Sequence, residues 1–186
     1  MFEIRFLSGN KFKIEEASTI LKRVSVSVIP INEKIEELQT ADTHNLVKDK
    51  ALKAFQLIGR PLFVEHTGLY LSHMNGLPGG LTQIFWDTLQ AERFTQLFGS
   101  AADNSVIAKT LIGFVDGRKF EFFEGSIKGS VPVAPRGNRD FQWDCVFVPD
   151  GYAQTFAEMG DQKNEISMRR RALDQFSEYL ENRGKV

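Results

Sequence analysis

Residues 2–23, FEIRFLSGNKFKIEEASTILKR, carry the pattern that decides the fold. Phe2–Leu7 alternates between apolar and polar residues and then becomes apolar, which predicts a β-strand. Ser8-Gly9-Asn10 follows as a tight turn, and from Lys11 to Arg23 apolar side chains recur at helical spacing. The stretch therefore predicts a strand, a turn and a helix, the first unit of a layered α/β protein.

The chain that follows repeats this alternation of strand and helix. Ser25–Ile29 alternates again, and we expect this strand to stop at Pro30. A helix is predicted from His44 to Ile58, with Gly59 as its C-terminal stop. Leu62–Glu65 has the pattern of a short buried strand. The order strand, helix, strand, helix, strand favours an α/β sheet.

The rest of the chain adds a hairpin and three further elements. We expect a helix at Trp86–Phe98, hairpin strands at Ser105–Asp116 and Lys119–Val131, a strand at Trp143–Phe147 and a closing helix at Ile166–Asn182. The sequence contains no internal repeat and no linker. Residues 1–186 are therefore predicted to form a single α/β domain, a two-lobed mixed β-sheet flanked by helices with a central cleft.

Composition and charge narrow the class of protein. The chain is 42% hydrophobic, 25% charged and has a formal net charge of −1, which gives no reason to expect binding to a nucleic-acid polymer or an anionic membrane. It has no signal-peptide pattern and no run near the roughly 20 apolar residues of a membrane span. Cys145, the one cysteine, excludes an internal disulfide. We therefore expect a cytoplasmic protein.

The first turn has the features of a phosphate site. A strand delivers Ser8, Gly9 and Asn10 to the start of a helix, where free backbone N–H groups and the positive end of the helix dipole meet. Lys13 lies on the first helical turn and can reach the same place. The alternative interpretation is a surface helix that Asn10 simply caps.

A further group of polar and aromatic side chains indicates a functional site only when its members are considered together. Taken singly, each is expected to be a solvated surface group or part of the core. Together they offer carboxylates for a hard cation, positive charges for phosphates and an aromatic ring for a base, which favours nucleotide chemistry. The set comprises Glu37, Lys50, Glu65, His66, Trp143, Asp144, Lys163, Ser167, Arg169 and Arg170.

Several separated motifs resemble, in order, those of the inosine/xanthosine triphosphate pyrophosphatase family. SGNKFK (8–13) is similar to that family's [ST]-G-N-x-x-K turn, and IEELQ (35–39) to its E-[ILY]-Q segment. VEHTGL (64–69) resembles V-E-D-[ST]-[GC]-L and precedes NGLPGG (75–80). The block at 133–159 resembles the family's long F-G-[WY]-D-P-x-F motif, and QKNEISMRRRAL (162–173) its K-N-x-[IV]-S-H-R-x-R-A-L motif.

The resemblance implies a fold, a reaction and a set of site residues. It implies a two-lobed α/β homodimer that hydrolyses a nucleoside triphosphate, with a deaminated purine, to the monophosphate and pyrophosphate. The implied cofactor is Mg²⁺, with Mn²⁺ or another divalent ion as the alternative. Carried over by position, the residues that would hold the triphosphate are Ser8, Asn10, Lys13, Lys50 and Lys163, and Glu37 would bind the metal. The purine would lie between the aromatic rings of Phe141 and Trp143. Its polar edge would contact Asp144, Ser167 and Arg169.

His66 stands where the family pattern has an aspartate that binds or orients the metal and the attacking water. Imidazole is a poor Mg²⁺ ligand, but it accepts a proton near neutral pH. Three hypotheses follow. In the first, His66 is a replacement base while Glu37 and Glu65 bind the metal. In the second, the metal is a transition ion that accepts a nitrogen ligand. In the third, hydrolysis is lost and the protein only binds nucleotides.

Three further positions depart from the family pattern. Met168 replaces a histidine that reads the keto edge of the base, and methionine donates no hydrogen bond. Gln142 replaces a glycine and Cys145 a proline beside the base-flanking aromatics. These departures leave the base preference open, because Gln142 either crowds the pocket or supplies a new hydrogen bond to a different base. The cations that face the phosphates all match the pattern, which supports nucleotide binding more strongly than turnover.

Overall fold

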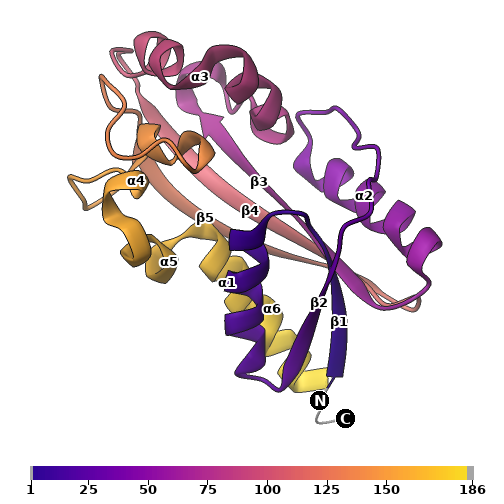
Figure 1. The fold of residues 1–186 in the computed structure, drawn as a ribbon. Helices are drawn as coiled ribbons and strands as arrows, with labels where there is room; N and C mark the ends of the chain where they lie inside the picture. Colours follow the sequence, from indigo (N-terminus) through magenta and orange to yellow (C-terminus); the bar gives the residue numbers. More distant parts are fainter. Residues whose placement is uncertain (1, 184–186) are drawn as a thin grey trace.

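A six-stranded mixed sheet organises the protein, whose computed structural model describes residues 2–183 (Figure 1). The strand order is β2-β1-β3-β4-β5-β6. β1 is parallel to β2 and β3, and the other neighbours are antiparallel. The strands are β1 (Phe2–Leu7), β2 (Val26–Ile31), β3 (Leu62–Leu71), β4 (Ser105–Val115), β5 (Phe120–Ser130) and β6 (Val148–Pro149).

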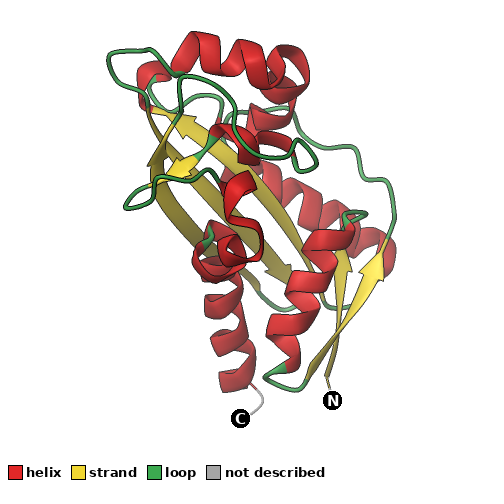
Figure 2. Ribbon diagram, turned by 60° about the vertical axis from the view of Figure 1, so that its left-hand side comes forward, coloured by secondary structure: helices red, strands yellow, loops and turns green. Residues whose placement is uncertain are grey.

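Helices cover both faces of this sheet (Figure 2). They are α1 (Lys11–Lys22), α2 (Thr43–Ile58), α3 (Thr82–Phe98), α4 (Phe156–Met159), α5 (Lys163–Ile166) and α6 (Met168–Arg183). Short 3-10 helices lie at Ser72–Met74 (η1), Gly79–Leu81 (η2), Gln142–Val146 (η3) and Gly160–Gln162 (η4). Within residues 2–183, the helices are all too short or too polar to span a membrane.

The alternation of side chains along the long strands builds separate cores on opposite faces. Phe63 and Ile112 pack with α1 and α6, whereas their neighbours Val64 and Leu111 pack with α2 on the other face. A third core lies at the far ends of β3, β4 and β5 and includes α3 and η3. The predicted mixed α/β sheet flanked by helices is confirmed, and the long strands β3–β5 connect its two ends.

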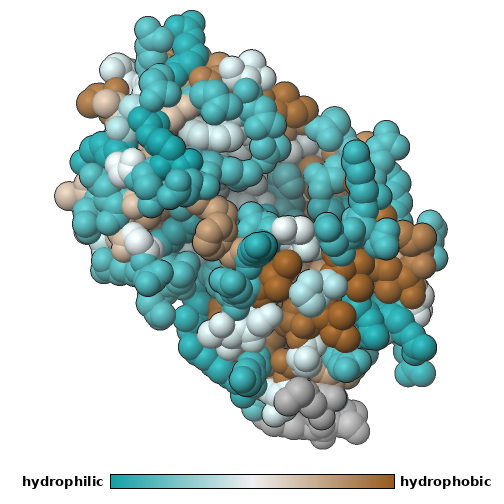
Figure 3. Space-filling view, viewed as in Figure 1, coloured by the Kyte–Doolittle hydropathy of each residue, from teal (hydrophilic) through white to brown (hydrophobic). Residues whose placement is uncertain are grey.

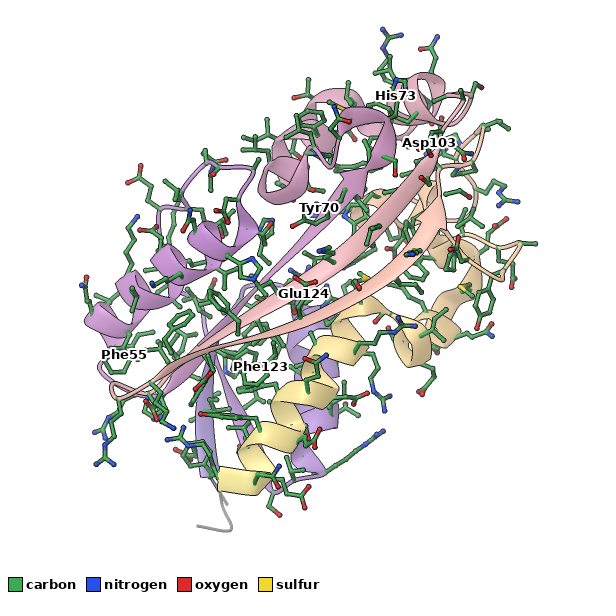
Figure 4. All side chains as sticks on the ribbon, turned by 180° about the vertical axis from the view of Figure 1, so that it is seen from behind. Phe55, Tyr70, His73, Asp103, Phe123 and Glu124 are labelled. Carbon is green, nitrogen blue, oxygen red and sulfur yellow. The ribbon has the colours of Figure 1, made fainter. Side chains whose placement is uncertain are left out.

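Figure 4 shows the same alternation from behind, on β5. Phe123 is buried against Phe176 of α6, with ring centroids 5.0 Å apart. Its neighbour Glu124 points to the opposite face and pairs with Lys109 of β4 at 3.2 Å. The predicted hairpin of β4 and β5 is therefore confirmed, with its turn at Asp116–Lys119.

The predicted end of β3 at Glu65 is wrong, because the strand runs on to Leu71. A Cβ at Gly68 would lie 2.5 Å from the Gly79 carbonyl oxygen, so this glycine permits a close approach of two backbone segments and makes no turn. On its other side β3 pairs with β1 only at Leu62 and Phe63. Glu65 therefore lies in mid-strand but just beyond the carboxyl end of β1, which keeps it next to the turn at Ser8.

Three other predicted elements differ from the structure. β2 continues through Pro30 to Ile31, which an edge strand tolerates because one side of its backbone has no partner strand. Of Trp143–Phe147, predicted as a strand, the buried residues 143–146 belong to the 3-10 helix η3, and Phe147 follows it. The predicted closing helix is interrupted at Ser167, whose extended backbone (ψ 157°) separates α5 from α6.

Candidate functional site

A cavity of about 280 Å³ opens where α1, α2, β3, α3 and α6 approach one another. On the face shown in Figure 3 the surface is hollowed between the two ends of the sheet, and hydrophilic side chains border the hollow. The cavity is lined by Lys13, Glu37, Lys50, Glu65, His66, Thr67, Thr82, Gln83, Trp86, Phe141, Gln142, Trp143 and Arg169. Segments far apart in the sequence thus bring cations and carboxylates to one place.

The turn between β1 and α1 has the predicted shape. Asn10 is the N-cap of α1, and its Oδ1 accepts a hydrogen bond from the Lys13 backbone N–H at 3.2 Å. Ser8 Oγ accepts from the Asn10 backbone N–H, also at 3.2 Å. Both side chains are therefore used within the turn, and neither lines this cavity. Their contribution to the site is to fix the start of α1 and with it the place of Lys13.

Glu65 is the centre of a buried charge cluster. Its two carboxylate oxygens accept hydrogen bonds from Arg169 Nε, each at 3.0 Å, and Lys13 Nζ lies 3.1 Å from Oε1. Thr67 Oγ1 also donates to Oε1, at 3.0 Å. Burial raises the pKa of Glu65, but Arg169 and Lys13 outweigh it and lower the pKa to about 2. Glu65 is therefore ionised throughout the physiological range.

Glu37 supplies a second carboxylate, nearer the opening of the cavity. It contacts Lys50 Nζ of α2. Burial raises the pKa of Glu37, yet the charge of Lys50 and its hydrogen bond lower it overall. Unlike Glu65, Glu37 has a single cationic partner in the structure, so part of its carboxylate is free to bind a ligand.

His66 places an imidazole with an open nitrogen in the same cavity. Its Nε2 is buried and has no hydrogen-bond partner among residues 2–183. Burial, followed by the charge of Lys13, lowers the pKa of His66 to about 4. The ring is therefore neutral at neutral pH, and its buried Nε2 is an unused hydrogen-bonding site within the influence of the Lys13 and Glu37 charges.

A larger cavity of about 620 Å³ adjoins the first and shares Phe141 and Arg169 with it. Asp144 and Lys163 form a buried ion pair on its wall. Lys163 Nζ lies 4.2 Å from the centroid of the Phe141 ring, a cation–π contact. Asp144 Oδ1 has no hydrogen-bond partner within the described residues. The cavity thus combines an aromatic ring with charged donors and an unused acceptor.

The structure divides the predicted site residues between these two cavities. Lys13, Lys50, Glu37, Glu65, His66 and Trp143 line the smaller one, Asp144 and Lys163 the larger one, and Phe141 and Arg169 both. Lys163 is therefore not beside Lys13 and Lys50, but lies across Phe141 from them. Ser167 lines neither cavity, and its Oγ accepts from the Arg170 backbone N–H.

Two departures from the family pattern have clear positions. Met168 is 0% exposed and packs in the third core, away from both cavities. Gln142 lines the smaller cavity, where its Nε2 donates to Gln83 Oε1 of α3 at 2.6 Å.

Sequence reasoning missed Glu16 and Gln83. Glu16 accepts from Arg169 Nη1 at 3.1 Å, and burial, its largest influence, raises its pKa. It follows Lys13 by three residues on α1, a spacing that places both on one helix face and could have identified it. Gln83 offers no such signal, because its role depends on a contact with Gln142, 59 residues away.

Comparisons with known proteins agree in both sequence and fold. A model of the Ham1 family matches residues 4–179. The chain is 31% identical over 182 residues to a dITP/XTP pyrophosphatase of Methanopyrus kandleri, covering 97% of each chain. It is 36% identical over 190 residues to an inosine triphosphate pyrophosphatase of Kluyveromyces lactis, covering 98% of this chain and 97% of the relative.

Two solved structures share the fold. A HAM1 protein from Coxiella burnetii superposes with a TM-score of 0.84 at 26% identity, over 97% of this chain and 98% of that one. The Ham1 protein of Staphylococcus aureus gives a TM-score of 0.82 over 97% and 99%, and its 23% identity supports the fold alone.

Proposed function

The chain belongs to the Ham1 family, and from that premise we propose that it hydrolyses a non-canonical purine nucleoside triphosphate to the monophosphate and pyrophosphate. It is a hydrolase of the class to which its relatives, the dITP/XTP and inosine triphosphate pyrophosphatases, belong. The observation that carries the proposal is the cavity in which Lys13, Lys50 and Arg169 meet Glu37 and Glu65. Binding without hydrolysis is not favoured, because the relatives are named for hydrolysis.

The triphosphate would lie in the smaller cavity. Lys13 and Lys50 offer charges from two helices, and the first turn of α1 offers the backbone N–H groups of Lys11 and Phe12, which the Asn10 side chain does not cap. Phosphoryl transfer needs little covalent participation by the protein, so that alignment and neutralisation of charge supply most of the catalysis. Lys163 would act from the larger cavity, at the base end of the nucleotide.

A divalent cation, expected to be Mg²⁺, fits the residues only in part. Residues 2–183 contain no group of three or more His, Cys, Asp or Glu side chains poised around a metal. Glu37 has a free carboxylate oxygen, whereas both oxygens of Glu65 bind Arg169. We therefore assign Glu37 as the main carboxylate ligand and Glu65 as the anchor for Lys13 and Arg169. Mg²⁺ commonly takes its other ligands from phosphates and water, where it neutralises charge and acidifies bound water.

His66 is proposed as the acceptor that orients the attacking water. Its neutral ring and open Nε2 can accept a hydrogen bond from water. With a pKa of about 4 its basicity is close to that of a carboxylate, the group that the family pattern has at this place. The hypothesis that a transition ion replaces Mg²⁺ remains an alternative, because the same nitrogen could ligate Mn²⁺ or Co²⁺.

The base would occupy the larger cavity. Phe141 offers a ring face there, while Lys163 and Arg169 can donate to carbonyl oxygens and Asp144 Oδ1 can accept from a ring N–H. A purine that carries a carbonyl beside an N–H, such as hypoxanthine or xanthine, presents that combination. The buried Met168 takes no part in this recognition.

The assembly and compartment belong to the same proposal. We infer a homodimer, which the family resemblance implies, and light scattering of the purified protein would measure it. A cytoplasmic location is supported by the single cysteine, Cys145, which is a buried free thiol.

The function is tested by measuring pyrophosphate release from a panel of nucleoside triphosphates. The panel comprises ITP, dITP, XTP, the four common ribonucleoside triphosphates and UTP analogues, and each is assayed separately with Mg²⁺, Mn²⁺ and Co²⁺. We expect release from the deaminated purines and a loss of at least tenfold in kcat/KM for Lys13→Ala, which removes a charged hydrogen-bond donor. Lys11→Ala, on the same helical turn but exposed, is the matched control. No release from any nucleotide with any of the three metals would refute the proposal.

A further inference from the structure

Gln142 has a backbone conformation that usually requires glycine. Its φ is +38°, in the left-handed region that other residues seldom adopt. Strain of this kind persists only where surrounding contacts hold it in place. The contacts of the Gln142 side chain therefore indicate what the residue does.

A directed set of hydrogen bonds connects Gln142 to α3. Gln142 Nε2 donates to Gln83 Oε1 at 2.6 Å. Gln83 Nε2 in turn donates to Asp87 Oδ1 at 2.8 Å, which turns the Gln83 amide oxygen toward Gln142. Both glutamines line the smaller cavity. The bond thus links the first residue of η3 to the first turn of α3 at the edge of the candidate site.

Gln142 lies between two aromatic residues with different surroundings. Trp143 is buried and packs against Phe147, with ring centroids 5.9 Å apart. Phe141 borders both cavities and contacts Phe12 of α1 edge-on, at 5.9 Å between centroids. Trp143 is therefore fixed by the core, whereas the Phe141 ring lies at the cavity border between Phe12 and Lys163, and its backbone is placed by the adjoining Gln142.

We propose that the Gln142–Gln83 bond is a latch that positions Phe141 for the nucleotide before the nucleotide arrives. The inference rests on the proposed function, since it assumes that the base lies against Phe141. A loop ordered in advance does not have to be ordered on binding, so the latch lowers KM. The side-chain amides of Gln83 and Gln142 are not among the charged groups, such as Lys13 and Lys50, that are assigned to the phosphates. Loss of the latch is therefore expected to change KM and to leave kcat unchanged. Gln83 and Gln142 are positioning residues.

The test is a double-mutant cycle on KM and kcat for the best substrate of the panel, with Gln83→Ala, Gln142→Gly and the double variant. Each single variant raises KM roughly fivefold, the equivalent of one hydrogen bond, and leaves kcat within about twofold. The double variant raises KM no further than either single variant. Glycine tolerates a positive φ, so Gln142→Gly does not threaten folding.

A rescue variant and a control complete the design. Gln83→Lys combined with Gln142→Glu restores a donor and an acceptor across the edge, keeps Asp87 as a partner and returns KM toward the original value. Gln96→Ala, exposed on the same helix, leaves KM unchanged. A double variant whose KM change is the product of the two single changes, or an unchanged KM, overturns the latch.

Hydrogen exchange separates this outcome from failure of the proposed function. In the free protein, the latch predicts faster amide exchange over residues 138–146 in both single variants, with or without turnover. If the wild type hydrolyses nothing but the variants exchange faster, the function fails and the latch stands. Unchanged exchange in both single variants rejects the latch by itself.

Discussion

Arg169 donates from Nε to both carboxylate oxygens of Glu65 at 3.0 Å, and this buried pair ties the start of α6 to the middle of β3. Arg169 also binds Glu16 of α1, and Glu65 also binds Lys13 of the same helix. Two acidic and two basic side chains thus form one network under the candidate site. Such a network fixes Lys13 and Arg169 in place before any nucleotide binds.

Glu65→Gln is expected to destabilise the fold strongly, because it leaves Arg169 and Lys13 buried with less compensating negative charge. Removing one partner of a buried ion pair costs about 3–5 kcal/mol, and the amide retains part of the hydrogen bonding, so we expect the lower end of that range. Urea denaturation without nucleotide or metal measures the effect. Glu178→Gln, exposed on α6, is the control and changes stability by less than about 0.5 kcal/mol. Equal midpoints for the two variants would show that the network is not structural.

Much of the fold could be predicted from local sequence, because local patterns decide it. Apolar spacing and the Asn10 cap predict β1 and α1, and Gly59, at φ +64°, ends α2 as expected. The end of β3 was predicted too early because the apolar run stops at Glu65, whereas the strand continues through Gly68, where the backbone of Gly79 approaches closely. The strand prediction at Trp143–Phe147 failed because a buried apolar run has the same pattern in a strand and in a 3-10 helix.

The sequence predicted which residues form the candidate site better than it predicted which of those residues contact one another. Motif resemblance named Glu65 and Arg169, but their pairing joins residues 104 positions apart and has no local signature. The separation of Lys163 from Lys13 and Lys50 depends on how Phe141 divides the two cavities. The bond of Gln142 to Gln83 likewise arises only when α3 and η3 pack together.

Asp144→Asn is expected to weaken binding of the base while the phosphate end of the site stays intact. Asp144 carries the charge that balances the buried Lys163, and its Oδ1 is the unused acceptor of the larger cavity. We expect KM for dITP to rise about tenfold or more, the effect of losing a charged hydrogen bond, with a smaller change in kcat.

Steady-state kinetics with dITP and with inorganic triphosphate separate these effects for Asp144→Asn. Inhibition by inorganic triphosphate, which has no base, should be unchanged in the variant. Asp150→Asn, which is exposed, serves as the matched control. A parallel loss of triphosphate inhibition would place Asp144 with the phosphate groups and contradict the assignment.

His66 predicts a specific pH dependence of stability. Its pKa falls from 6.5 in the unfolded chain to about 4 in the folded protein, mainly through burial. Between those values the unfolded state binds more protons, so the contribution of His66 to stability is present above pH 6.5 and is lost as the pH falls toward 4. We expect a loss of about 2 kcal/mol between pH 7 and pH 5, measured by urea denaturation in metal-free buffer.

His66→Gln isolates that contribution from other titrating groups. The variant should lose much less stability between pH 7 and pH 5 than the wild type. Glu65, with a pKa of about 2, acts in a lower window: its contribution is present above pH 4.5 and is lost as the pH falls through 2. Below pH 4.5 both proteins should therefore lose stability together. Identical slopes above pH 5 would contradict the buried, neutral state of His66.

His66→Asp is expected to shift the metal dependence of turnover toward Mg²⁺. The substitution places a carboxylate in the cavity that already holds Glu37, and Mg²⁺ prefers oxygen ligands to imidazole nitrogen. We expect the Mg²⁺ concentration that gives half the maximal rate to fall about tenfold, which corresponds to a gain on the order of 1 kcal/mol from one added negative charge. The ratio of the rate with Mn²⁺ to the rate with Mg²⁺ should fall as well. His44→Asp, on an exposed part of α2, controls for charge alone. An unchanged metal profile in His66→Asp would mean that residue 66 does not face the ion.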